Sequence, residues 1–105
     1  MVMAIATREM TSPETIWSGQ QDAMSVRDAG WIQMFCESNQ EILDMMIQAY
    51  RITEDERVHI PVNVCYDGFY SSHLMEGLEI PTQEAVDAFL PAHNGCAYLD
   101  PGHPQ

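Results

Sequence analysis

Arg8 is the residue whose type and position most strongly indicate chemistry. It follows a short apolar run, VMAIA at residues 2–6, and is one of only four Lys or Arg residues in the chain. In an open α/β sheet, ligands bind beyond the carboxyl ends of the strands, which is where Arg8 would lie. A guanidinium presents a planar fork of donors that matches a carboxylate or a phosphate. Arg8 is therefore a candidate anion ligand, unless it only neutralises nearby Glu9, Glu14 or Asp22.

Asp67 and His73 form a second candidate group, after the apolar run IPVNVC at residues 60–65. Both can project from the same strand end, although a pair of this kind is commonly a hydrogen bond that orders the loop. The four histidines, at positions 59, 73, 93 and 103, lack the spacing of metal ligands, so we predict no metal site. A stand-alone metal hydrolase is not supported for the same reason. The P-loop and G-x-S-x-G signatures are absent as well.

Strands and helices alternate along the chain that positions these side chains. Short apolar runs predict three strands, at residues 2–6, 31–35 and 60–65. Helical patterns follow them, at residues 20–28, from a Ser38-x-x-Glu41 capping box to about Thr53, and at residues 83–90. Such alternation is typical of βαβ units, so we predict an α/β fold with a parallel sheet and flanking helices.

Several finer features are also predicted. A helix start at Ser12-Pro13-Glu14 leads into a short helical turn over residues 15–17, and residues 71–73 continue a loop after the third strand. Residues 78–80 resemble a short edge strand. One face of the central helix should pack in the core, because its apolar residues follow helical spacing: Ile42, Met45, Met46, Ala49, Tyr50 and Thr53.

The composition limits the classes of function. The chain has 105 residues, 46% of them hydrophobic, and a net charge of −12. That charge disfavours nucleic acid and anionic membrane surfaces, and no apolar run approaches the roughly 20 residues that span a bilayer. Cys36, Cys65 and Cys96 lie far apart, so we expect small core residues in a reducing cytoplasm rather than disulfides or cluster ligands. A secretory leader is not indicated.

Longer stretches of the sequence point to one family. The segments TREMTSPETIWSGQQDAMSVRDAGWIQMFCESNQEILDMMIQAYRITED and IPVNVCYDGFYSSHLMEGLEIPTQEAVDAFLP resemble the alpha subunit, or the equivalent first domain, of 2-oxoacid:ferredoxin oxidoreductases of the pyruvate:ferredoxin type. The resemblance covers about residues 2–90, and its most specific parts are the Arg8-Glu9 turn, QQD-x4-RD-x-GW, SNQE and DGF-x3-H.

The resemblance implies a fold and an activity. Residues 1–91 would be the later half of the pyrimidine-binding domain of a thiamine-diphosphate fold, and residues 92–105 a linker toward a following domain. The enzymes of this family oxidise a 2-oxoacid, pyruvate foremost, to carbon dioxide and an acyl-CoA, and pass electrons to ferredoxin. Arg8 would match the arginine that binds the substrate carboxylate in this family. Asp67 and His73 would contact the cofactor or another subunit.

The resemblance also implies what this segment lacks. Thiamine diphosphate and magnesium would be held mostly by other domains or subunits, and the 4Fe–4S clusters by other subunits still. The chain would be a fragment or a split gene product that is inactive alone, and we expect it to be poorly soluble or molten when isolated, because half a parallel sheet leaves an unpaired edge. The competing interpretation is a non-catalytic acidic interaction module, which would explain the charge and the missing site residues.

Overall fold

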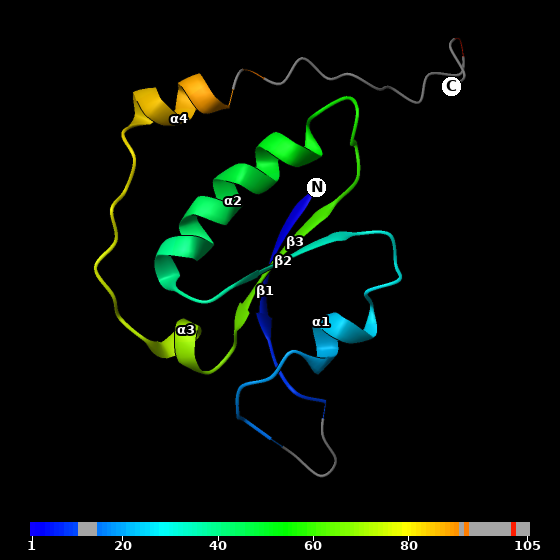
Figure 1. The fold of residues 1–105 in the computed structure, drawn as a ribbon, viewed down its shortest axis with the longest axis vertical. Coiled ribbons are helices and arrows are strands. Elements are labelled where there is room, and N and C mark those ends of the chain that lie inside the picture. Colours follow the sequence, from blue (N-terminus) through cyan, green and yellow to red (C-terminus); the bar gives the residue numbers. More distant parts are fainter. Residues whose placement is uncertain (11–14, 91, 93–101, 103–105) are drawn as a thin grey trace.

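The computed structural model describes residues 1–10, 15–90, 92 and 102 of the chain. Its elements, in chain order, are β1 (Val2–Thr7), α1 (Gln21–Ser25), β2 (Ile32–Cys36), α2 (Asn39–Thr53), β3 (Val62–Asp67), α3 (Tyr70–His73) and α4 (Gln83–Phe89). The strands cross the middle of the molecule, with α2 on one side of them and α1 on the other (Figure 1). The predicted α/β class is confirmed.

The three strands of the described region form one parallel sheet in the order β1-β3-β2. Val62 at the start of β3 pairs with Val2 of β1 and Ile32 of β2, and Asp67 at its end pairs with Thr7. β3 is buried from residue 62 to residue 65, as expected of a central parallel strand that is covered on both faces. The parallel sheet with flanking helices is therefore confirmed, and β3 is its centre.

α2 begins at the predicted capping box. Ser38 is its N-cap, and the Glu41 N–H donates to Ser38 Oγ at 3.2 Å. The Glu41 carboxylate accepts a hydrogen bond from the Glu37 N–H at 2.7 Å, one residue before the amide that a standard box satisfies. Two backbone donors at the start of the helix thus find acceptors, which explains why the longest helix begins here.

The core lies between α2 and one face of β3. Its members are Cys36, Ala49, Val62 and Val64, with Val2, Ile32, Met34, Ile42, Met45, Met46, Ile52 and Tyr66 packed against them. Burying one Val side chain contributes about 1.5–3 kcal/mol, so this contact is a main source of stability. The predicted helix face is correct except at Tyr50, whose side chain is 44% exposed, while Ile52 packs against the core instead.

Two helical predictions after β1 need correction. Residues 15–17 are not helical, because Thr15 Oγ1 accepts a hydrogen bond from the Trp17 N–H at 3.1 Å and holds a local turn. α1 spans five residues rather than the predicted nine, since its N-cap Gln20 makes no side-chain hydrogen bond and only Ala23 is buried. The predicted helix start at residues 12–14 lies mostly outside the described residues.

Three further boundaries differ from the predictions. β3 begins two residues late because Pro61 has no N–H for the ladder and the Ile60 carbonyl accepts from Thr53 Oγ1 at 2.7 Å. Residues 70–73 form the short helix α3 rather than loop. Residues 78–80 form no strand, because the side-chain amide of Gln40 makes hydrogen bonds with both the N–H and the carbonyl of Glu79.

The last predicted helix is confirmed as α4, whose N-cap Thr82 accepts from the Ala85 N–H at 3.3 Å. α4 buries none of its residues. In the described part of the chain, no helix is long and apolar enough to cross a membrane.

Candidate functional site

The carboxyl ends of β1 and β3 are held tightly together. The Gly68 N–H donates to the Thr7 carbonyl at 2.9 Å, and the buried Thr7 donates through Oγ1 to the Tyr66 carbonyl at 3.1 Å. A Cβ atom on Gly68 would collide with the Thr7 carbonyl oxygen, so only glycine permits this approach. Arg8 and Phe69 therefore leave the sheet from adjacent strands at the same edge.

The first helix fixes the path of the chain after β1. The Arg8 N–H donates to Asp22 Oδ2 at 3.0 Å, and the Met10 N–H donates to Gln21 Oε1 at 3.2 Å. The other carboxylate oxygen, Asp22 Oδ1, accepts from the Ala23 N–H at 2.7 Å. The QQD segment thus positions the backbone of Arg8, a role that its sequence alone did not reveal.

The Arg8 side chain is exposed, and its guanidinium forms no ion pair with any residue that the structure describes. Neither Glu9 nor Asp22 neutralises it, since the Asp22 oxygens accept backbone N–H groups instead. Glu14 lies outside the described residues. Among the described residues nothing neutralises Arg8, so its guanidinium is available to an anion at the sheet edge.

Two other arginines are used structurally, in loops that lead to the amino ends of β2 and β3. Arg27 lies 3.7 Å from Asp28, and both side chains are largely exposed. Arg57 makes a 2.7 Å contact with Asp55, and this hydrogen bond lowers the pKa of the Asp55 carboxyl. Exposed pairs of this kind contribute little to stability.

Asp67 orders the loop that follows β3. Its Oδ1 accepts from the N–H groups of Phe69 at 2.8 Å and Tyr70 at 2.6 Å, and so caps the turn that becomes α3. The same strand end that supplies Gly68 for the contact with β1 therefore also supplies the acceptor that starts the next helix. DGF is thus a structural motif as well as a candidate contact.

His73 is held in place by hydrogen bonds to its neighbours. Ser72 Oγ donates its single proton to the Gly68 carbonyl at 2.7 Å, so it can only accept from His73 Nδ1, which lies 2.8 Å away. The Phe69 carbonyl, 3.0 Å from the same nitrogen, is also only an acceptor. Nδ1 is therefore the donor to these two oxygens. Asp67 and His73 order one loop through separate hydrogen bonds, and their contact with a cofactor or a subunit stays a prediction.

Aromatic side chains gather around Phe69, beside the end of β1. Its ring centroid lies 5.3 Å from that of Trp17, 5.5 Å from Tyr70 and 6.0 Å from His73. Trp17 and Tyr70 are 64% and 66% exposed, so this cluster presents apolar surface outward. Sequence reasoning missed Trp17, because its contact with Phe69 joins residues far apart in the chain.

The two cysteines of the described region behave as core residues. Cys36 and Cys65 are buried and unpaired, whereas Cys96 lies outside the described residues. Burial raises the pKa of the Cys65 thiol to about 11, with smaller contributions from Asp22 and Cys36. Desolvation likewise raises the pKa of Cys36. Both thiols are therefore protonated near neutral pH and unsuited to nucleophilic or ligand roles.

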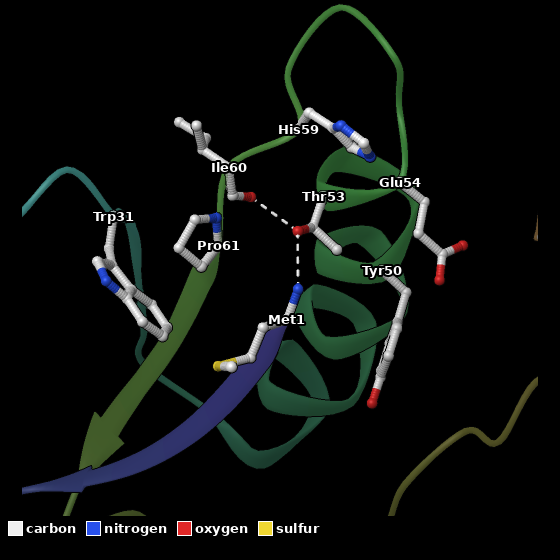
Figure 2. Close-up of a pocket in the computed structure, with 8 residues that line it drawn as sticks. All are labelled: Met1, Trp31, Tyr50, Thr53, Glu54, His59, Ile60 and Pro61. Carbon is white, nitrogen blue, oxygen red and sulfur yellow. Dashed lines mark hydrogen bonds between the residues drawn. The ribbon is translucent and has the colours of Figure 1, made fainter. Parts of the chain in front are cut away.

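A pocket of about 530 Å³ lies at the opposite, amino edge of the sheet (Figure 2). Its lining residues come from the start of β1, the end of α2 and the loops before β2 and β3: Met1, Trp31, Tyr50, Thr53, Glu54, His59, Ile60 and Pro61. Thr53 Oγ1 connects two of these parts, since it accepts from the Met1 amino group at 3.3 Å and donates to the Ile60 carbonyl. This pocket cannot serve Arg8, which lies beyond the far end of the strands.

Comparison with known proteins decides the family. The family model described as pyruvate flavodoxin/ferredoxin oxidoreductase, thiamine diphosphate-binding, matches residues 1–105. The chain belongs to this family.

The similarity to individual relatives extends over nearly the whole of this chain. Pyruvate synthase subunit PorA of Pyrococcus horikoshii is 49% identical over 99% of this chain and 27% of its own length. The alpha subunit of NADH-dependent phenylglyoxylate dehydrogenase of Aromatoleum evansii is 48% identical over 90% of the chain and 22% of its own length. Ketoisovalerate oxidoreductase subunit VorA of Pyrococcus furiosus is 40% identical over 87% and 23%. The chain thus spans about a quarter of the length of the relatives that it matches.

The described residues can be tested against the cofactor of this family. The diphosphate of thiamine diphosphate requires cations, commonly a magnesium ion held by carboxylates. Among the described residues, no group of three or more His, Cys, Asp or Glu side chains could hold a metal ion. The described residues therefore offer no ligand set for that magnesium ion.

Proposed function

We propose that this chain is part of the pyrimidine-binding domain of a thiamine-diphosphate-dependent oxidoreductase. In this proposal residues 1–91 belong to that domain and residues 92–105 lead toward the next. The complete enzyme oxidises a 2-oxoacid, with pyruvate as the leading candidate, to carbon dioxide and an acyl-CoA, and passes electrons to ferredoxin. The observation that carries the proposal is the Arg8 guanidinium, exposed at the carboxyl edge of the sheet without an ion pair to the described residues.

The proposed role of Arg8 is to hold the substrate carboxylate. A bidentate pair between guanidinium and carboxylate fixes both the position and the plane of the acid group. Since the carbonyl of a 2-oxoacid is bonded directly to the carboxylate, fixing one group orients the other. Such positioning lowers the activation free energy because orientation is established on binding. Thiamine diphosphate, when bound, supplies the carbanion chemistry.

The names of the relatives support a role that the substrates share. Pyruvate, phenylglyoxylate and ketoisovalerate have different side groups, but all three are 2-oxoacids. A residue at this edge that recognises the carboxylate would serve each of them. The choice of pyruvate rests on the relatives that carry its name.

Asp67 and His73 have a supporting role in this proposal. They hold the loop that presents Phe69 beside the substrate edge, and the exposed His73 side chain is the contact for a cofactor or another subunit. Magnesium and the diphosphate are held mainly outside this chain, and 4Fe–4S clusters lie on other subunits. Coenzyme A and ferredoxin reach the complex through those subunits, and the complex works in the cytoplasm.

The decisive experiment replaces Arg8 in the complete enzyme. Arg8→Ala should lower kcat/KM for the 2-oxoacid by at least about 30-fold, mostly through KM, because it removes charge-assisted hydrogen bonds worth about 2 kcal/mol or more. Arg27→Ala is the matched control, since Arg27 is equally cationic but pairs with Asp28 in an exposed turn. Unchanged kinetics in Arg8→Ala would remove the proposed role and favour the acidic interaction module.

A further inference from the structure

An arm of the molecule, residues 74–90, leaves the sheet and exposes apolar side chains. It runs along the outside of α2 and ends in α4, and it contributes no strand to the sheet (Figure 1). Its exposed apolar residues are Leu74 (55% exposed), Met75 (97%), Leu78 (42%), Ile80 (77%) and Phe89 (44%). Exposed apolar side chains that gather on one segment favour an interaction site in soluble proteins.

Polar contacts through its backbone, rather than burial of its side chains, hold the arm in place. Gln40 Oε1 accepts from the Glu79 N–H at 2.8 Å, and Gln40 Nε2 donates to the Glu79 carbonyl at 3.1 Å. Asn39 Nδ2 donates to the Leu74 carbonyl at 2.9 Å, and the Asn39 N–H donates to the Glu76 carboxylate at 3.1 Å. The first turn of α2 therefore holds the arm through the main chain of Leu74 and Glu79 and through the Glu76 side chain, and leaves the apolar side chains of the arm exposed.

A groove of about 470 Å³ separates the arm from α2. It is lined by Gln40, Asp44, Glu79, Ile80, Pro81 and Thr82. Asp44 is exposed, and its Oδ1 accepts from Gln40 Nε2 at 3.1 Å, which places a carboxylate at the wall of the groove. The groove thus combines an apolar residue, Ile80, with negative charge.

The charge of the arm limits what can cover it. Residues 74–90 contain four acids, Glu76, Glu79, Glu84 and Asp87, and no Lys or Arg. A second copy of this chain has only four arginines, and two of them already pair with Asp28 and Asp55. A chain of net charge −12 would also repel its own copy. Charge complementarity therefore favours a different, basic partner.

We propose that the arm and its groove form the docking surface for another subunit of the oxidoreductase, which presents an apolar patch flanked by Lys or Arg. The apolar side chains of the arm enter that patch, and a basic side chain of the partner lies in the groove beside Asp44. This inference rests on the proposed function in one respect, namely that the chain works within a multi-subunit enzyme.

The first experiment maps what covers the arm in the assembled enzyme. A photo-crosslinking amino acid replaces Met75 in the full-length subunit, and another replaces Val26, a 49% exposed apolar residue outside the arm, as the control. We expect position 75 to crosslink to a Lys- or Arg-containing peptide of a different subunit. A crosslink to a second copy, to the same polypeptide, or no crosslink above the control would overturn the proposal.

The second experiment measures the dissociation constant between the full-length subunit and the remaining subunits. Ile80→Asp should raise it at least about tenfold, since it places a charge against an apolar patch, whereas Val26→Asp should change it less than about twofold. Asp44→Asn should weaken the salt dependence of binding relative to the control Asp28→Asn, because it removes the charge in the groove. An unchanged dissociation constant in Ile80→Asp, together with an unchanged salt dependence in Asp44→Asn, would overturn the docking surface.

The same variants separate this inference from the proposed function. At saturating subunit concentration, Ile80→Asp should leave KM for the 2-oxoacid unchanged. Arg8→Ala should raise that KM and leave the dissociation constant unchanged. Failure of either expectation therefore affects one proposal without deciding the other.

Discussion

The N–H of Gly68 donates to the carbonyl oxygen of Thr7 at 2.9 Å, which joins the ends of β1 and β3 at the edge where Arg8 emerges. The contact is close enough that a Cβ atom on Gly68 would collide with the same oxygen. The position of Arg8, the candidate anion-binding residue, therefore depends on Gly68, which has no side chain. It also depends on Asp22, which holds the backbone N–H of Arg8.

Replacing Gly68 by alanine should separate the ends of β1 and β3. We expect Gly68→Ala to lower the free energy of unfolding by about 1–3 kcal/mol, because the backbone must move and the hydrogen bond to Thr7 weakens. The melting temperature of the full-length subunit measures this effect. Gly77→Ala is the control, since a Cβ there would meet no atom within 4 Å. Equal melting temperatures for the two variants would contradict the steric argument.

Replacing Asp22 by alanine should disturb Arg8 without touching its side chain. Asp22→Ala removes the acceptor of the Arg8 and Ala23 N–H groups. We expect KM for the 2-oxoacid to rise by about 3–10-fold in the complete enzyme, with a smaller change in kcat, since Arg8 is present but less well positioned. Asp28→Ala serves as the comparison, because Asp28 pairs with the exposed Arg27. An effect of equal size in both variants would argue against positioning.

The loop after β3 should respond differently to two substitutions of Asp67. Asp67→Ala leaves the N–H groups of Phe69 and Tyr70 without their acceptor and should cost about 1–2 kcal/mol of unfolding free energy. Asp67→Asn keeps an acceptor oxygen and should cost less than half as much. Hydrogen exchange of the two amides in the full-length subunit checks the assignment. Slow exchange of both amides in Asp67→Ala would show that another group caps this turn.

The buried thiol of Cys65 should react slowly with alkylating reagents. Its pKa of about 11 lies two units above the ordinary value of 9.0, so at pH 8 the reactive thiolate is about a hundredfold scarcer than in an exposed cysteine. Because the pKa is raised, reactivity should increase only as the pH approaches 11. Mass spectrometry of the labelled subunit, with the urea-unfolded chain as reference, measures both rates. Similar rates in the two states at pH 8 would contradict the burial of Cys65.

Local signals in the sequence predicted the elements that have strong local causes. The Ser38–Glu41 box, the alternation of apolar runs and the Thr82 cap each act within a few residues, and each appears in the structure. Weak local signals failed: residues 15–17 were predicted helical and are not, because a side chain of Thr15 competes for the backbone. Tyr50 was predicted to face the core, but its side chain is exposed and Ile52 of α2 packs against the core instead.

By itself, then, the sequence determined the α/β class, the family resemblance and the placement of Arg8 at the end of a strand, since each depends on neighbouring residues. Only the tertiary structure decided that β3 lies between β1 and β2, that Asp22 rather than a salt bridge holds Arg8, and that Trp17 packs on Phe69. The reason is physical: these contacts join residues distant in the chain, and they exist only once the strands have paired and brought those residues to one edge.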